Sequence, residues 1–297
     1  MLRSGPRTKS FVVSRRHGIG ELPAETDSLA SLITDATGFR ATRLIGDSPH
    51  SLVVSAVEIT TRQRVALKFF KRSLGAEEAR SWAAGIVEGV GGWGAHPGIA
   101  DTLQYGAMEG YRYIARELVE GPSVQTILDR TGRLTGSEGL DLAVQIVEIL
   151  EVAHSRQRHH NNITPANIFV EPYGSVRLTD WTACAGQWKG QADIGYPASS
   201  GRTENAIADL RQLGEVLAKV HDADSPPPPD SLHGLDRNGS DLMRRILREC
   251  ETTLDPSRSL SEIYHELLQF FESHRRRRRL QLSALVKSRG LAGATDR

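Results

Sequence analysis

Two neighbouring stretches of the chain gather the side chains best suited to chemistry. Residues 158–170 read RHHNNITPANIFV and residues 176–182 read VRLTDWT, so histidines and asparagines are followed closely by one carboxylate. Amide and carboxylate oxygens are hard ligands of the kind that Mg²⁺ takes in proteins, and a histidine can serve as a general base. His159 and His160 are the available bases, although we favour a structural role for His160 and an exposed position for His159.

The register of these stretches resembles the catalytic loop H-R-D-L-x-x-x-N and the D-F-G of the eukaryotic-like serine/threonine protein kinases, bacterial branch included. His160 stands at the loop histidine, Asn167 at the final asparagine and Asp180 at the D-F-G aspartate. The resemblance implies that Asn167 and Asp180 are the two magnesium ligands. It also places Asn162 where the family has its catalytic aspartate, and an asparagine amide has no basic site that could accept a proton.

Other positions of the resemblance also depart from an active kinase. Thr164 replaces the lysine that neutralises the γ-phosphate, and Asn161 replaces the arginine that reads a phosphorylated activation loop. The activation segment has no A-P-E, and residues 195–200 are its nearest equivalent. The scaffold survives better, because Asp209 stands where a helix aspartate ties down the catalytic loop, and Arg258 ends a D-P-x-x-R motif.

A lysine for nucleotide phosphates lies upstream. The strand sequence VALK ends in Lys68 and resembles the V-A-I-K of kinases, which implies that this lysine reaches the α and β phosphates of ATP. Lys68 precedes Asn162 by 94 positions, close to the family's usual separation. The resemblance implies a glutamate partner on the following helix; Glu88 is one candidate, and Glu77 and Glu78 are the alternatives.

The glycine-rich loop expected before this strand is largely missing. Alignment with G-x-G-x-x-G-x-V gives GDSPHSLV, in which only the first glycine, Gly46, remains. Asp47 adds negative charge where phosphates would lie and Pro49 removes a backbone donor, so an ordinary β-turn is the better interpretation. Val53 and Ala66 still fit the apolar roof of an adenine pocket.

The segment YIARELVEG, residues 113–121, resembles the strand and hinge that hold adenine in kinases. The resemblance implies that the backbone from Glu117 to Val119 binds the base. The gatekeeper position falls on Arg116, where the family usually has an uncharged residue. A buried guanidinium needs a partner, and pairing with Glu88 or folding across the back pocket would weaken nucleotide binding.

Two groups of elements must position these residues. Short β-branched and apolar runs separated by turn residues predict strands at 39–45, 52–59, 64–70, 99–105 and 111–118, with a helix at 75–90. Helical patterns follow at 139–154, 205–220, 241–250 and 260–271, and the first is apolar nearly all round, so we expect it to be buried. The sequence predicts an α+β, two-lobed protein-kinase-like fold. Its N-lobe would hold a five-stranded antiparallel sheet and one helix, and its C-lobe would be mainly helical.

We divide the chain into four parts: an N-terminal extension at 1–38, a kinase-like N-lobe at 39–119, a kinase-like C-lobe at 120–272 and a basic C-terminal tail at 273–297. The tail begins with the five-arginine run Arg275–Arg279. Such a run could contact RNA, an acidic partner or anionic lipid, but it is more often a solvated helix end, and we assign it no function.

Composition restricts the cellular compartment and the classes of partner that we expect. The 297 residues are 39% hydrophobic and 25% charged with a formal net charge of +1, so no global field favours nucleic acid or a membrane surface. The two cysteines lie outside any metal-binding spacing, and no apolar run approaches the ~20 residues of a spanning helix. We expect a cytoplasmic protein without a membrane span.

The surviving and missing motifs together predict a pseudokinase. It could bind ATP or Mg·ATP through Lys68, Asn167 and Asp180, yet would transfer phosphate poorly or not at all and act by binding a protein partner. One alternative is an active kinase with an unorthodox loop, because phosphoryl transfer is mostly positioning and charge stabilisation. The other is an interaction module that binds no nucleotide.

Overall fold

The structure is a computed structural model that describes residues 37–48, 51–71, 96–108, 111–134, 136–181, 202–220 and 260–275. The described residues before 84, together with 102–118, form one compact unit. The described residues of 84–101, together with those from 119 onward, form a second compact unit. The predicted helices at 75–90 and 241–250 and most of the two predicted terminal segments lie outside the described residues.

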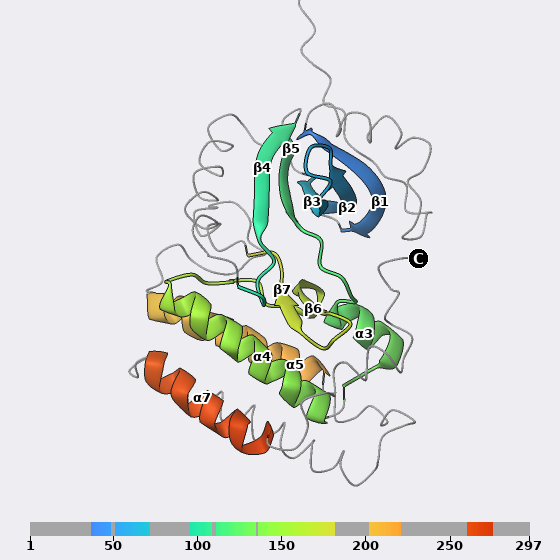
Figure 1. Cartoon of the computed structure of the whole chain (residues 1–297). Coiled ribbons are helices and arrows are strands. Elements are labelled where there is room, and N and C mark those ends of the chain that lie inside the picture. Colours follow the sequence, from blue (N-terminus) through green and yellow to red (C-terminus); the bar gives the residue numbers. More distant parts are fainter. Residues whose placement is uncertain are drawn as a thin grey trace, which may run out of the picture. The chain divides into compact units, whose positions relative to one another are not determined.

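The first unit is a five-stranded antiparallel sheet (Figure 1). Its strands are β1 (Phe39–Asp47), β2 (Ser51–Glu58), β3 (Arg64–Phe70), β4 (Thr102–Met108) and β5 (Tyr111–Glu117), in the spatial order β1-β2-β3-β5-β4. The Val, Leu, Ile and Thr content of these runs suits a pleated, half-buried surface, and each run is bounded by turn residues. The predicted five-stranded antiparallel sheet is therefore confirmed.

The two faces of this sheet differ sharply, because successive side chains on a strand point to opposite sides. One face forms an apolar core with these buried residues: Phe39, Leu44, Leu52, Val54, Ala56, Val65, Leu67, Phe69, Tyr113 and Ala115. The alternate residues of β3, which are Ala66, Lys68 and Phe70, belong to the opposite face. The period of two in the sequence thus separates the side chains of this apolar core from those on the opposite face of the sheet.

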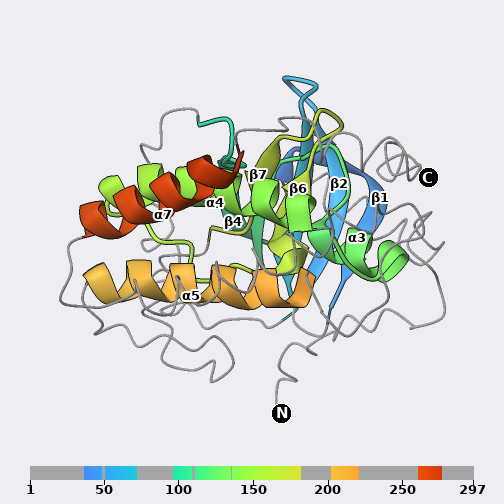
Figure 2. The same cartoon turned by 90° about the horizontal axis from the view of Figure 1, so that it is seen from below.

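The second unit is mainly helical. It contains α3 (Val124–Thr131), α4 (Gly136–Ser155), α5 (Arg202–Val220), α7 (Leu260–Arg275), a 3₁₀ turn at Pro165–Asn167 and a small hairpin of β6 (Ile168–Val170) and β7 (Val176–Leu178). Helix α4 packs against both α5 and α7 (Figure 2), which explains why its sequence is apolar nearly all round. No helix in the described ranges is long and apolar enough to cross a membrane.

The strand predicted at 99–105 begins later than expected. Ile99 belongs to a turn, in which its N–H donates to the carbonyl of His96, and it forms an isolated parallel bridge with Leu178 of β7. The Arg177 guanidinium donates to the Ile99 carbonyl at 2.9 Å. These contacts anchor Ile99 in the second unit, so β4 starts only at Thr102.

Gly121 marks a position where the backbone requires glycine. Its φ is +120°, and a Cβ placed there would lie 2.2 Å from the carbonyl oxygen of Val170. The next residues then dock on the small hairpin, because Val170 N–H donates to the Pro122 carbonyl at 3.0 Å. Ser123 caps α3 by accepting from the N–H of Thr126, a local signal that the sequence analysis did not use.

Candidate functional site

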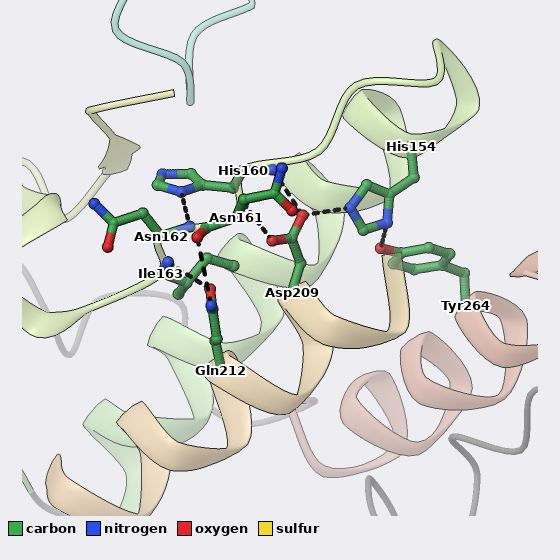
Figure 3. Close-up of polar contacts among 8 residues, drawn as sticks. All are labelled: His154, His160, Asn161, Asn162, Ile163, Asp209, Gln212 and Tyr264. Atoms are coloured by element: carbon green, nitrogen blue, oxygen red, sulfur yellow. Dashed lines mark hydrogen bonds and ion pairs between the residues drawn. The ribbon is translucent and has the colours of Figure 1, made fainter. Parts of the chain in front are cut away.

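The loop between α4 and β6 carries the predicted catalytic motif, and one carboxylate organises it. Asp209 of α5 is fully buried and accepts from the backbone N–H groups of His160 at 2.7 Å and Asn161 at 2.6 Å. Figure 3 shows this carboxylate between the loop backbone and His154 of α4. The predicted role of Asp209 in tying down the loop is confirmed. Asn161 has φ +57°, so these hydrogen bonds hold a non-glycine residue in a left-handed conformation.

A second set of polar contacts connects Asp209 to helix α7. His154 Nε2 lies 2.9 Å from Asp209 Oδ2, and the Tyr264 hydroxyl of α7 lies 2.6 Å from His154 Nδ1 (Figure 3). A carboxylate only accepts, so Nε2 carries a proton, and in the neutral ring Nδ1 accepts from the tyrosine. Burial, with the nearby carboxylates Asp209 and Glu151, raises the pKa of Tyr264 well above its ordinary value. The hydroxyl therefore keeps its proton and completes a chain from α7 to the loop.

The remaining loop contacts position the asparagines. Gln212 Oε1 accepts from the Ile163 N–H at 2.8 Å, and Asn167 Nδ2 donates to the Asn162 carbonyl at 2.9 Å. The Asn167 carbonyl in turn accepts from the Thr179 N–H at 2.9 Å, which ties the loop to the residue before Asp180. Because the amide nitrogen of Asn167 is used in this way, its oxygen is the atom left for a cation.

The conformation at Asp180 is set by packing on either side. Asp180 has φ +63°, and Trp181 after it is buried with its indole N–H donating to the Leu178 carbonyl at 3.0 Å. The Trp181 ring packs against the His160 ring at an interplanar angle of 49°, with ring centroids 4.6 Å apart. The predicted magnesium ligands Asn167 and Asp180 thus lie on two segments that are joined by the hydrogen bond from the Thr179 N–H to the Asn167 carbonyl. Both side chains offer the oxygen atoms that Mg²⁺ prefers.

Of the two histidines of the loop, His160 does not suit the role of a substitute base. His160 is fully buried, its Nδ1 accepts from the Asn162 N–H at 3.2 Å, and burial lowers its pKa despite the opposing charges of Asp209 and Asp180. His159 is half-buried rather than exposed as predicted, because its ring lies 5.2 Å from that of His154. In Figure 3 the Asn162 side chain points away from Asp209. His160 is a structural residue, as its buried position requires.

A further histidine, His96, closes the turn that precedes Ile99. Its Nδ1 accepts from the Gly98 N–H at 3.1 Å, and partial burial together with the positive charge of Arg156 lowers its pKa. Both influences favour the neutral ring that can accept this bond. Nothing in this contact implicates His96 in a reaction.

The first unit brings the predicted nucleotide residues to one face of its sheet. Strand pairing places Val53 opposite both Gly46 on β1 and Lys68 on β3, and it places Ala66 opposite Arg116 on β5. Residues that pair directly across antiparallel strands share a face. Gly46, Val53, Ala66 and Lys68 therefore lie on the face opposite the apolar core, together with the gatekeeper Arg116.

The remaining predicted nucleotide residues differ in burial and in position. Glu117 is half-buried at the end of β5, and Val119 is buried in the second unit. Glu88 lies outside the described residues. The Lys68 ammonium lies 5.5 Å from the centre of the Phe70 ring, and the buried guanidinium of Arg112 lies 4.7 Å from the same ring. Arg112 is a cation of this face that sequence reasoning missed, because its pattern gave no sign of burial.

The described residues contain no group of three or more histidine, cysteine, aspartate or glutamate side chains that could hold a metal ion by themselves. A magnesium site built from Asn167 and Asp180 would instead need phosphate oxygens as further ligands, which is the usual arrangement for this ion.

Comparison with known proteins identifies the family. The model of the protein kinase domain matches residues 39–203, more than half of the chain. The chain belongs to the protein kinase domain family. Its kinase domain is 32% identical over 163 residues to serine/threonine-protein kinase PknA of Mycobacterium tuberculosis, a match that covers 50% of this chain and 36% of that protein. Serine/threonine-protein kinase PknK of the same organism is 28% identical over 215 residues, covering 69% of this chain and 19% of that protein.

The chain therefore spans about a third or less of the length of these relatives. Among solved structures, the crystal structure of Rad53 1-466 in complex with AMP-PNP matches with a TM-score of 0.54 and 17% identity. That match covers 78% of this chain and 65% of the Rad53 chain. At this identity the likeness concerns the fold, and it confirms the predicted kinase-like architecture.

The Tyr264 hydroxyl gives a direct test of the chain of contacts in the kinase C-lobe. Tyr264→Phe removes the donor to a buried histidine nitrogen, and an unsatisfied buried acceptor costs about 1–3 kcal/mol, so we expect a loss of that size in the free energy of unfolding. Tyr173→Phe is the matched control, because Tyr173 is 83% exposed, and we expect a change within about 0.5 kcal/mol. Chemical denaturation measures both; equal effects of the two substitutions would contradict the assigned contact.

Proposed function

We propose that this kinase domain is a pseudokinase that binds ATP, alone or with Mg²⁺, and transfers phosphate poorly or not at all. Its role would be regulatory, exerted through binding to a protein partner. The observation that carries this proposal is a catalytic loop held by hydrogen bonds to the buried carboxylate of Asp209, in which the base position is an asparagine. A loop kept in shape without its reactive group fits a binding role.

Lys68, Asn167 and Asp180 are the residues proposed to contact the nucleotide and its metal. Lys68 shares a sheet face with Val53 and Ala66, which suits contact with phosphates beside an apolar surface for the base. Mg²⁺, when bound, would neutralise the negative charge of the phosphates. In this chain Asn167 and Asp180 would orient that ion, while Asn162 and Thr164 supply neither a base nor a positive charge.

An active serine/threonine kinase is the second candidate. It is favoured by the similarity of the domain to PknA, named as a serine/threonine-protein kinase, and by the intact positions of Lys68, Asn167 and Asp180. Phosphoryl transfer depends mainly on positioning and charge stabilisation, so some rate can persist without a base.

A module that binds no nucleotide is a third candidate. It is supported by the cation Arg116, which lies on the same sheet face as Ala66 and Lys68. We also propose a cytoplasmic location, which the two isolated cysteines suit.

Binding is tested by the shift in melting temperature that ATP causes, with and without Mg²⁺. We expect millimolar ATP to raise the melting temperature of the wild type, because a ligand that binds only the folded state stabilises it by RT ln(1 + [L]/Kd). Lys68→Met should lose most of the rise with ATP alone, and Asp180→Asn should lose the additional rise that Mg²⁺ gives. No shift at millimolar ATP would contradict nucleotide binding and favour the interaction module.

A further inference from the structure

The charged side chains of the five-stranded sheet are sorted between its two faces. All six cations of the strands lie on the face opposite the apolar core: Arg40, Arg43, Arg64, Lys68, Arg112 and Arg116. The three acids of the strands each pair directly with a residue of the apolar core, in the pairs Asp47–Leu52, Glu58–Phe39 and Glu117–Val65. Since directly paired residues share a face, the strands place no acid among the six cations.

Three of these arginines gather at one end of the cationic face. Val57 of β2 pairs with Arg40 on one side and with Arg64 on the other, so the backbones of the two arginines lie about 10 Å apart in one row. Arg43 pairs with Ser55 in the next row, about 7 Å along the strands. Arg40 and Arg64 are exposed, and Arg43 is half-buried. We refer to Arg40, Arg43 and Arg64 as the arginine cluster.

The nearby acids of the sheet have other contacts. The Glu58 carboxylate, at the end of β2, accepts from the Thr61 hydroxyl, and Glu58 pairs with Phe39 of the apolar core. Asp47 lies at the opposite end of β1, where it contacts Lys71. A guanidinium group binds a carboxylate through two parallel hydrogen bonds. The arginine cluster therefore suits carboxylates that come from outside the sheet.

The spacing of the arginine cluster fits an extended polypeptide. Alternate side chains of an extended segment point the same way and repeat at about 7 Å, which is the distance between the two rows of the cluster. Strand β1, which carries Arg40 and Arg43, is the outermost strand at one side of the described sheet (Figure 1), so a segment can lie along it. The arginines would repel a basic segment, and this repulsion favours an acidic one. The formal net charge of only +1 disfavours a nucleic acid, which binds mainly through extended positive charge.

We propose that the arginine cluster binds an extended acidic segment of a protein partner, with carboxylates at alternate positions facing Arg40, Arg43 and Arg64. This inference rests on the proposed function, in which the domain acts by binding a protein partner, and it names the chemistry of that partner. Lys68 follows Arg64 by four positions on β3, about 13 Å along the strand. The acidic segment and a nucleotide would thus occupy different parts of one face and can be bound together.

A labelled ten-residue peptide of alternating glutamate and serine is the probe, and fluorescence anisotropy measures its binding to the whole chain. We expect the wild type to bind it, and a rise in salt from about 50 to about 500 mM to weaken the binding, because salt screens exposed charges. The combined variant Arg40→Gln, Arg43→Gln and Arg64→Gln should bind about tenfold more weakly, the effect of losing three exposed ion pairs.

A second combined variant, Arg130→Gln, Arg211→Gln and Lys219→Gln, is the matched control. It removes the same charge from exposed positions of α3 and α5, and we expect peptide binding to stay within about twofold of the wild type. Equal losses in the two variants would show that the peptide responds to net charge alone and would overturn the inference. Tighter binding of a single-stranded oligonucleotide of equal charge would also overturn it.

The shift in melting temperature with ATP separates this inference from the proposed nucleotide binding. If the wild type shows the shift but does not bind the peptide at about 1 mM, the inference fails and nucleotide binding stands. If it binds the peptide with the expected salt dependence but shows no shift, the inference is supported and nucleotide binding fails. These wild-type measurements need no variant, so they decide the matter even if a combined variant folds poorly.

Discussion

Replacing Asp209 with asparagine is expected to lower the free energy of unfolding by about 3–5 kcal/mol, the cost typical of removing one partner from a buried charged group. The carboxylate is fully buried and accepts from two loop N–H groups and from His154. An asparagine offers one acceptor oxygen and turns an NH₂ toward groups that also donate, so buried donors are left without acceptors. Chemical denaturation measures the loss.

Asp129→Asn is the control for this substitution. Asp129 is exposed on α3, where its carboxylate accepts from the Gln125 side chain, so its replacement should change the unfolding free energy by less than about 0.5 kcal/mol. A loss below about 1 kcal/mol for Asp209→Asn would show that the hydrogen bonds around Asp209 do not hold the loop.

The second large effect concerns the reaction. Combining Asn162→Asp with Thr164→Lys restores a base and a positive charge at the positions where the family has them, and we expect phosphate transfer to rise at least about 10²-fold, since a positioned base alone contributes roughly 10²–10⁴-fold. The loop backbone that would carry both residues is already held by Asp209 and Gln212. Transfer from ATP to a generic protein substrate provides the measurement.

Asn161→Asp is the appropriate control for that gain. It adds the negative charge of Asn162→Asp one residue earlier, outside the base position, on a residue whose backbone N–H donates to Asp209. If the combined variant transfers no more phosphate than Asn161→Asp, then the missing base and charge are not what limits the reaction.

Local pattern was sufficient to predict most of the architecture. The strand runs alternate between core and outer face over a whole sheet, and each is closed by turn residues, so 64–70 was predicted at its observed bounds. Motif spacing also indicated the role of Asp209, because its position relative to the loop is part of the resemblance. Helix α5 begins before the predicted Asn205 and α4 before the predicted Gly139, since polar first turns hide the start of an apolar pattern.

Contacts between distant parts of the chain were not predictable in this way. Tyr264 and His154 are 110 positions apart, and no periodicity links them. The only signal was a tyrosine on the buried side of an amphipathic helix, whose hydroxyl must find a partner. Ile99 was assigned to a strand because it is apolar, yet its bonds go to His96 and Arg177. A turn was expected between the first two strands, but not the hydrogen bond from the Ser51 N–H to the Ser48 hydroxyl, because the sequence does not show which donor a hydroxyl will accept from.

The central claim, a kinase fold without phosphate transfer, is tested most directly by transfer of labelled γ-phosphate from ATP to a generic substrate and to the protein itself. The wild type and Asp180→Asn should be compared at equal concentration in the presence of Mg²⁺. We predict that both give the same background signal, because the wild type lacks the base and the γ-phosphate cation. Transfer by the wild type that disappears in Asp180→Asn would contradict the account and establish an active kinase.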